Sequence, residues 1–248
     1  MSKLFDLTGK TVLVTGAASG IGRCVAVEAS KLGANLVLVD LNEAGLQETL
    51  GMMAEGTHIT LTCDLTNTRE RENLVSKVGK LDGVVNCVGV GMTLPFKFST
   101  EKELGRIMNI NFFGPICLVQ TLDKEKKINK NASIVYMASI DGTVTGHIGN
   151  SCYAASKGAI MGSVRTQALE FASRGIRVNC VSPARVNTPL LKRDNISEEQ
   201  VKANKELYPM KRYAEPIEIA GYILYLLSDV STYTSGSNLV IDGCFTVM

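Results

Sequence analysis

The sequence predicts an α/β fold, a doubly wound parallel sheet of seven strands with helices on both faces. Short runs of β-branched and apolar residues alternate with longer segments whose apolar residues recur at helical spacing. No linker, internal repeat or low-complexity segment interrupts the alternation, so we expect one domain over residues 1–248. With 45% hydrophobic residues, the chain can build a substantial core.

The strands are expected at Thr11–Thr15, Asn35–Val39, His58–Thr62, Gly83–Asn86, Ser133–Ala138, Arg177–Val181 and Asn238–Ile241. The helices are expected at Ile21–Leu32, Glu43–Met53, Arg69–Val78, Glu101–Asn109, Asn111–Leu122, Tyr153–Ser173 and Pro216–Leu227.

A glycine-rich motif, Thr15-Gly16-Ala17-Ala18-Ser19-Gly20-Ile21-Gly22, joins the first strand to the first helix. Glycine permits a tight turn there, and the N–H groups and dipole of the helix N-terminus attract a pyrophosphate. An ordinary glycine-rich turn is the alternative.

The second strand leads into Asp40. At this place in dinucleotide-binding folds an acid accepts hydrogen bonds from the adenosine ribose, and its charge repels a 2′-phosphate. No Lys or Arg lies inside the glycine loop or closely follows Asp40. The pattern therefore favours NAD(H) over NADP(H), with a strand-end aspartate that caps the next turn as the alternative.

Tyr153 and Lys157 are four residues apart in a predicted helix. This spacing places them on one helix face, where a lysine cation lowers the pKa of a neighbouring phenol. A tyrosine of this kind exchanges a proton with an alcohol or carbonyl oxygen near neutral pH. The alternative is a solvated helix face.

Taken together, these residues resemble the short-chain dehydrogenase/reductase family, in its single-domain type with a Rossmann fold, over essentially the whole chain. Gly16, Gly20 and Gly22 match its TGxxxGxG loop, and Tyr153 and Lys157 match its YxxxK motif. Ser139 matches its catalytic serine, and Asn111 matches the asparagine that completes the catalytic tetrad.

The resemblance implies a role for each member of the tetrad. Tyr153 is the expected general acid and base, and Lys157 lowers its pKa and holds the nicotinamide ribose. Ser139 places the substrate oxygen, and Asn111 anchors a water that links Lys157 to solvent. The implied cofactor contacts are Gly16, Ser19, Gly20, Ile21, Gly22, Asp40, Leu41, Asp64, Leu65, Asn86, Gly89, Tyr153, Lys157, Pro183, Val186 and Thr188.

Three positions depart from the family pattern. Cys87 replaces the second asparagine of Asn-Asn-Ala-Gly and cannot make its amide hydrogen bonds. Ala184 replaces a glycine after the sixth strand and restricts the backbone near the nicotinamide. Cys244 replaces the last glycine of Asp-Gly-Gly.

Arg185 is the candidate substrate contact, because a guanidinium binds carboxylates and vicinal hydroxyls well. The alternative is an ion pair with Asp194 or Glu198. The segment from Thr188 to Arg212 is polar and lacks a strand, with a short helix expected near Glu198–Leu207. Such an insertion is either a lid over the ligand or a surface excursion.

We therefore expect an NAD(H)-dependent oxidoreductase that interconverts a secondary alcohol and a ketone. Arg185 favours a polar substrate such as a sugar, sugar acid or hydroxy acid. A 3-oxoacyl thioester reductase is the first alternative, and a non-catalytic dinucleotide sensor or scaffold is the second. The resemblance also implies a homotetramer built through the helices at 111–122 and 153–171, with a homodimer as the alternative.

Composition narrows the remaining classes. The net charge of +2 is scattered, which argues against nucleic-acid binding. The seven cysteines have no Cys-x-x-Cys spacing, and no signal peptide or membrane span is visible, so we expect a soluble cytoplasmic protein. His58 and His147 are far apart, which disfavours a metal site or a Ser-His-Asp triad.

Overall fold

The computed structural model describes residues 3–191 and 197–248. Its centre is the predicted parallel seven-stranded sheet, and the structure shows its strand order to be β3-β2-β1-β4-β5-β6-β7. The strands are β1 Thr11–Thr15, β2 Asn35–Asp40, β3 His58–Thr62, β4 Leu81–Asn86, β5 Ile128–Met137, β6 Arg177–Pro183 and β7 Asn238–Ile241.

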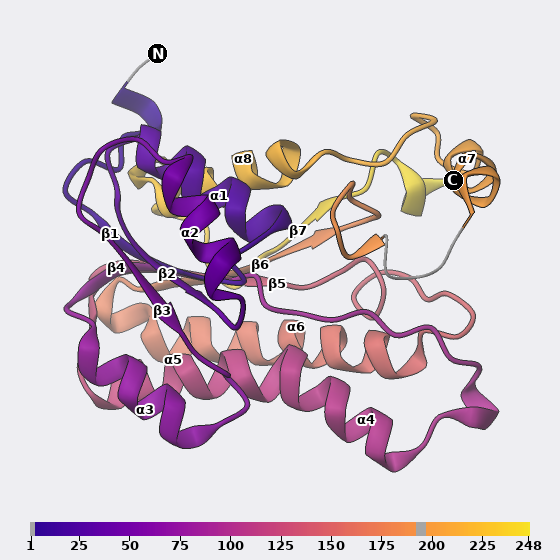
Figure 1. The fold of residues 1–248 in the computed structure, drawn as a ribbon, viewed down its shortest axis with the longest axis horizontal. Coiled ribbons are helices and arrows are strands. Elements are labelled where there is room, and N and C mark those ends of the chain that lie inside the picture. Colours follow the sequence, from indigo (N-terminus) through magenta and orange to yellow (C-terminus); the bar gives the residue numbers. More distant parts are fainter. Residues whose placement is uncertain (1–2, 192–196) are drawn as a thin grey trace.

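Helices cover both faces of the sheet (Figure 1). On one face lie α1 Gly20–Lys31, α2 Glu43–Gly51 and α8 Pro216–Leu227. On the other lie α3 Thr68–Lys77, α4 Glu101–Met108, α5 Gly114–Lys124 and α6 Ser151–Phe171. A further helix, α7 Glu198–Glu206, lies near the C-terminus of the chain in Figure 1. Among the described residues, no helix combines the length and apolar character that a membrane crossing requires.

The alternation of side chains along each strand divides the core into two layers. Leu13 of β1 packs with Leu118 and Ile160 on the α5 and α6 face. Its neighbours Val12 and Val14 pack on the opposite face, under α1 and α8. Because apolar residues are needed on both faces, the strands read as continuous hydrophobic runs.

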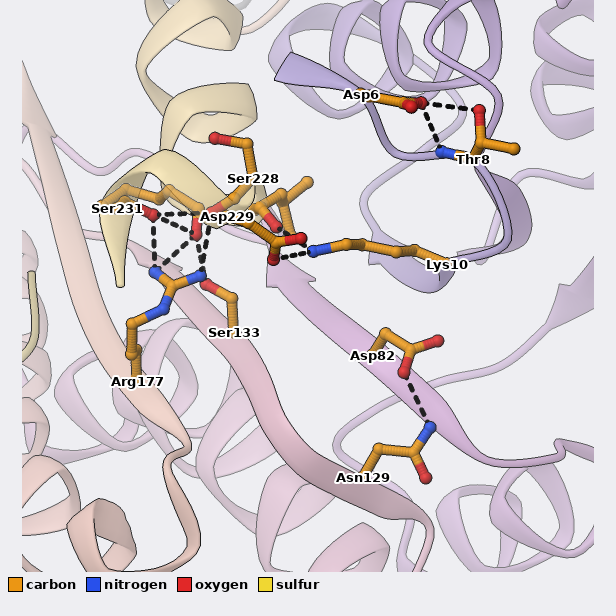
Figure 2. A network of polar contacts seen from close by, with 12 residues as sticks. Asp6, Thr8, Lys10, Asp82, Asn129, Ser133, Arg177, Ser228, Asp229 and Ser231 are labelled. Carbon is orange, nitrogen blue, oxygen red and sulfur yellow. Dashed lines mark hydrogen bonds and ion pairs between the residues drawn. The ribbon is translucent and has the colours of Figure 1, made fainter. Parts of the chain in front are cut away.

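A polar network ties the chain together near the amino ends of the strands (Figure 2). The buried Arg177 at the start of β6 donates hydrogen bonds of 2.7 Å to the oxygen of Leu226 and to Ser231 Oγ. Ser133 of β5 donates to the same Leu226 oxygen at 2.6 Å. The end of α8 is therefore attached to two strands on the side of the sheet away from their carboxyl ends.

Most predicted boundaries lie within two residues of the observed ones, and β1, β3, β7 and α8 coincide with the prediction. Two differ more. β5 begins at Ile128 rather than Ser133, because Leu81 of β4 pairs with Ile128 beyond a register shift. The helix predicted to begin at Asn111 begins at Gly114, because a π-helical segment, Asn109–Phe113, joins α4 to α5.

Candidate active site

A cavity of about 600 Å³ opens at the carboxyl ends of the strands. Loops after β1, β2, β3, β4, β5 and β6 line it, together with the start of α6. Parallel strands bring such loops to one edge of the sheet, and the order of strands reverses between β1 and β4. Residues as far apart in the sequence as Gly16 and Tyr208 therefore line one cavity.

The glycine loop forms one wall of this cavity. Gly16 has φ +68, and a Cβ at Gly22 would lie 2.2 Å from the oxygen of Gly16, so only glycine permits this approach of helix to strand. Ser19 is the N-cap of α1 but makes no side-chain capping bond. The first internal bond of the helix is Arg23 N–H to Ser19 O, which leaves the first turn to face a ligand.

Asp40 lies beside this loop. Its two carboxylate oxygens accept hydrogen bonds from the N–H groups of Ala18, at 3.1 Å, and Asn42, at 3.0 Å. Arg23, which follows the glycine loop in sequence, pairs with Glu48 and donates hydrogen bonds to Thr49 Oγ1 and to the oxygen of Ala18. Of the Lys and Arg side chains in the described part of the chain, only Lys157 and Arg185 line the cavity. The residues present fit the adenosine ribose of a dinucleotide.

The predicted cofactor residues converge on this cavity with one exception. Asn86 ends β4 fully buried, does not line the cavity, and neither its amide nitrogen nor its oxygen has a partner among the described residues. The others line the cavity: Gly16, Ser19, Gly20, Ile21, Gly22, Asp40, Leu41, Asp64, Leu65, Gly89, Tyr153, Lys157, Pro183, Val186 and Thr188.

Ser139, Tyr153 and Lys157 meet at the other end of the cavity. The loop after β5 presents Ser139, and the first two turns of α6 present Tyr153 and Lys157. The Ser139 hydroxyl lies near enough to Tyr153 to lower the pKa of its phenol. The Lys157 nitrogen lies 5.7 Å from the centre of the Tyr153 ring and donates a hydrogen bond of 2.7 Å to Met137 O.

The expectation that Lys157 lowers the pKa of Tyr153 is wrong for this structure. Burial raises the pKa of the Tyr153 phenol to about 12, the nearby Ser139 hydroxyl offsets this rise only in part, and the Asp141 carboxylate adds to it. Burial likewise lowers the pKa of Lys157 to about 8. Both groups lose solvation here, and the loss of solvation of the charged form is the largest cause of each shift.

Asn111 lies behind the cavity wall rather than in it. The π-helical segment turns its side chain inward, where it is fully buried. Its oxygen accepts from Val90 N–H at 2.8 Å, and its nitrogen donates to Val90 O at 3.1 Å and to Ser156 Oγ at 3.0 Å. A π-helical turn breaks the helical period, and for this reason the sequence pattern predicted two helices that are interrupted at Ile110.

Arg185 lines the cavity and is half-buried. Its guanidinium lies beside the phenols of Tyr208 and Tyr213, where it partly offsets the rise in pKa that burial causes in both. Among the described side chains it makes no ion pair. Asp194 and the side chain of Glu198, the two alternative partners, lie outside what the structure describes, as does part of the expected Thr188–Arg212 lid, although Thr188 and Tyr208 line the cavity.

The three departures from the family pattern differ in their consequences. Cys87 stands where the family has a second asparagine amide. The side-chain amide of its neighbour Asn86 has no hydrogen-bond partner among the described residues. Ala184 needs no positive φ, so glycine is not required there. Cys244 has φ 68, a left-handed conformation that strains a residue with a Cβ.

The sequence prediction missed a group of cavity residues after Ser139, namely Asp141, His147 and Asn150. Asp141 is buried and accepts hydrogen bonds from His147 and Asn150. Their only sequence signal was their place between Ser139 and Tyr153. Among the described residues, no group of His, Cys, Asp and Glu side chains is arranged to hold a metal ion.

Comparisons with known proteins agree with this geometry. A family model described as enoyl-(acyl carrier protein) reductase matches residues 16–246. The 3-oxoacyl-[acyl-carrier-protein] reductase FabG of Rickettsia bellii is 33% identical over 97% of this chain and 98% of its own length. A tropinone reductase homolog of Arabidopsis thaliana is 35% identical over 96% of this chain and 91% of its own length. The crystal structure of a short-chain dehydrogenase/reductase (glucose/ribitol dehydrogenase) from Brucella melitensis matches with a TM-score of 0.89 and 28% identity, covering 98% of this chain and 99% of that one.

Proposed function

Since this chain belongs to the short-chain dehydrogenase/reductase family, oxidoreductases that act on CH–OH groups, we propose that it interconverts a 3-hydroxyacyl and a 3-oxoacyl group with NAD(H). The observation that carries the proposal is that Ser139, Tyr153 and Lys157 share one cavity with the glycine loop and Asp40.

In this proposal the side chains position the substrate and move one proton. Ser139 hydrogen-bonds the reacting oxygen, and Tyr153 donates a proton to it in reduction and takes one in oxidation. Lys157, held by Met137 O, and Asn111, held by Val90, support the proton path from behind Tyr153. The nicotinamide supplies or accepts the hydride when bound.

The glycine loop, Asp40 and Asp64 would hold the adenosine and pyrophosphate, and Val186 and Thr188 would hold the nicotinamide end. A preference for NAD(H) is supported by the Asp40 carboxylate, because it repels a 2′-phosphate. It is also supported by the scarcity of cations: the Lys and Arg side chains that line the described part of the cavity, Lys157 and Arg185, are not neighbours of Asp40.

For the substrate, the relatives favour the 3-oxoacyl alternative over the polar substrate that Arg185 suggested. The family model and the Rickettsia relative are both named for reductases of acyl carrier protein substrates. A sugar or hydroxy acid remains a second candidate, because Arg185 lines the cavity beside two phenols and has no carboxylate partner among the described side chains.

A turnover panel tests both substrate classes. Acetoacetyl-CoA, 3-hydroxybutyrate and a set of polyols would each be assayed with NAD(H) and NADP(H), with Tyr153→Phe as the control. We expect acetoacetyl-CoA to be the best substrate with NADH, and the control to lose about 10²–10⁴-fold in kcat. Wild type and control that are equally inert while both bind NADH would instead favour the non-catalytic sensor.

We also propose a homotetramer. The two segments that the family uses for assembly, 111–122 and 153–171, carry exposed apolar side chains here: Phe113 before α5 and Leu169 on α6 are 49% and 80% exposed. Sedimentation equilibrium tests this, and a monomer at micromolar concentration would contradict it. Leu169→Glu should lower the assembly state, because a buried unpaired carboxylate is costly.

A further inference from the structure

One group in the cavity has no place in the proposed proton transfer. Asp141 lies two residues after Ser139, and its side chain is 8% exposed. One carboxylate oxygen accepts a hydrogen bond from His147 Nδ1, and the other accepts from Asn150 Nδ2 at 2.7 Å. Because a carboxylate only accepts, Nδ1 carries the proton and the tautomer of His147 is set.

The His147 ring is held from a second direction by the C-terminal segment. It stacks on Phe245 with ring centres 5.6 Å apart, and Phe245 stacks on Tyr208 at 4.6 Å. Tyr208 in turn meets the ring of Tyr213 edge-on at 5.4 Å. Three chain segments far apart in sequence therefore fix one imidazole in the wall of the cavity.

This imidazole keeps one nitrogen free. The His147 side chain is 43% exposed and lines the cavity, and among the described residues its Nε2 has no hydrogen-bond partner. The ring edge that carries Nε2 is the one turned away from Asp141. A fixed ring with one unused polar atom at a cavity wall is built for a ligand contact.

The group is close to the reacting oxygen. The N–H of Asp141 donates to Ser139 Oγ at 3.2 Å, which leaves the serine hydrogen for another acceptor. Asp141 is also near enough to Tyr153 to act on its phenol electrostatically. His147 is therefore linked through Asp141 to Ser139 and Tyr153, the pair that receives the substrate oxygen.

We propose that His147 binds a second oxygen of the substrate, a few bonds from the reacting carbon, and that Asp141 and Phe245 position its ring. The inference rests on the proposed function. Both candidate substrate classes carry such an oxygen, as a thioester carbonyl or as a hydroxyl. The imidazolium form donates from Nε2 to a carbonyl, and the neutral form accepts at Nε2 from a hydroxyl.

The test compares three small ketones that differ two bonds from the reacting carbon. Ethyl 3-oxobutanoate has an ester carbonyl there, 4-hydroxybutan-2-one has a hydroxyl, and 2-pentanone has neither. His147→Phe keeps the stack on Phe245 and removes both ring nitrogens. We expect kcat/KM to fall about tenfold for the ester or the hydroxyketone, with the activity on 2-pentanone and the Kd for NADH unchanged. The arm that falls identifies the kind of oxygen.

Two further variants test the positioning roles. Phe245→Leu removes the stack but keeps the imidazole, and it should cause a smaller loss on the same ketone only. The double variant Asp141→Asn/His147→Phe should prefer the affected ketone over 2-pentanone, measured as the ratio of their kcat/KM values, to the same extent as His147→Phe alone. The second substitution adds no further loss because the two residues act as one unit.

The outcomes separate the two proposals. Losses of equal size on all three ketones, or no loss on any, would overturn the role of His147. Wild-type protein that reduces none of the ketones with either cofactor would overturn the proposed function, and this inference with it.

Discussion

The ammonium of Lys157 donates a hydrogen bond of 2.7 Å to the main-chain oxygen of Met137, the last residue of β5. This contact fixes a buried cation, 2% exposed, between the sheet and the ring of Tyr153. The described part of the chain provides no carboxylate partner for this cation, so burial lowers the pKa of Lys157 to about 8.

The free energy of unfolding should depend on pH because of this buried lysine. Between pH 8 and the unfolded-state pKa of 10.5, the unfolded chain binds a proton that the folded chain has released, so this group makes folding more favourable as pH rises. Below pH 8 its penalty is fully present. The excess stability of Lys157→Met over wild type should thus shrink between pH 7 and pH 10, by on the order of 2–3 kcal/mol.

Urea unfolding at both pH values measures this difference. The subtraction matters because buried cysteines such as Cys87 and Cys180, each with a pKa raised to about 12 by burial, give the opposite slope in both proteins. A difference that does not change with pH would contradict the buried-cation interpretation.

Gly89 controls the space next to the same lysine. A Cβ at Gly89 would lie 3.3 Å from Lys157 Nζ and 3.5 Å from Asn111 Oδ1, so Gly89→Ala should displace the ammonium by a few tenths of an ångström. We expect kcat to fall about tenfold with little loss of stability. Gly79→Ala is the matched control, because its Cβ would meet nothing within 4 Å. Wild-type kcat in Gly89→Ala would show that the position of Lys157 is not critical.

Asp40 should set the choice of cofactor. Asp40→Asn keeps the shape and the acceptor oxygen for the Ala18 N–H but removes the charge that repels a 2′-phosphate. The ratio of kcat/KM for NADH to that for NADPH should fall about tenfold or more. Asp6→Asn, whose carboxylate bonds only Thr8, is the control for a lost surface charge. A wild-type preference for NADPH would refute this reading of Asp40.

Arg177 and Lys10 carry similar charges in the network of Figure 2 but should differ in energetic weight. Arg177 is buried, and its loss removes three hydrogen bonds from a charged donor, to the oxygens of Leu226 and Ser228 and to Ser231 Oγ, so Arg177→Met should cost about 3 kcal/mol. Lys10 pairs with Asp229, whose side chain is 80% exposed, and Lys10→Met should cost under about 1 kcal/mol. Equal changes in the free energy of unfolding would contradict this ranking.

Cys244 should be a site of relievable strain. Its φ of 68 suits glycine, so Cys244→Gly should raise the free energy of unfolding by about 1 kcal/mol. Cys244→Ala removes the thiol but keeps the strain, and it should not stabilise the protein. A gain in both variants would mean that the thiol, and not the backbone, is responsible.

Much of the fold could be predicted from the sequence, because the patterns that indicate strands and helices are local. The apolar runs of β1, β2 and β6 indicate strands that are buried on both faces of the sheet. The start of β5 could not be predicted, because the segment Ile128–Ala132 contains polar residues and joins the sheet only through its pairing with β4. The π-helical segment at Asn111 was hidden for a similar reason: a π turn depends on what its side chains pack against.

The sequence by itself determined the parallel sheet, the glycine loop, the acid at the end of β2 and the spacing of Tyr153 and Lys157, since each depends on neighbours in the chain. Tertiary structure decided the pKa values of the Tyr153 and Lys157 side chains and the position of His147 in the cavity wall. Burial, which no spacing reports, reversed the expected pKa of Tyr153 and lowered that of Lys157. Only folding brings Phe245 and Tyr208 against His147, because the stack joins residues up to 98 positions apart (245 minus 147).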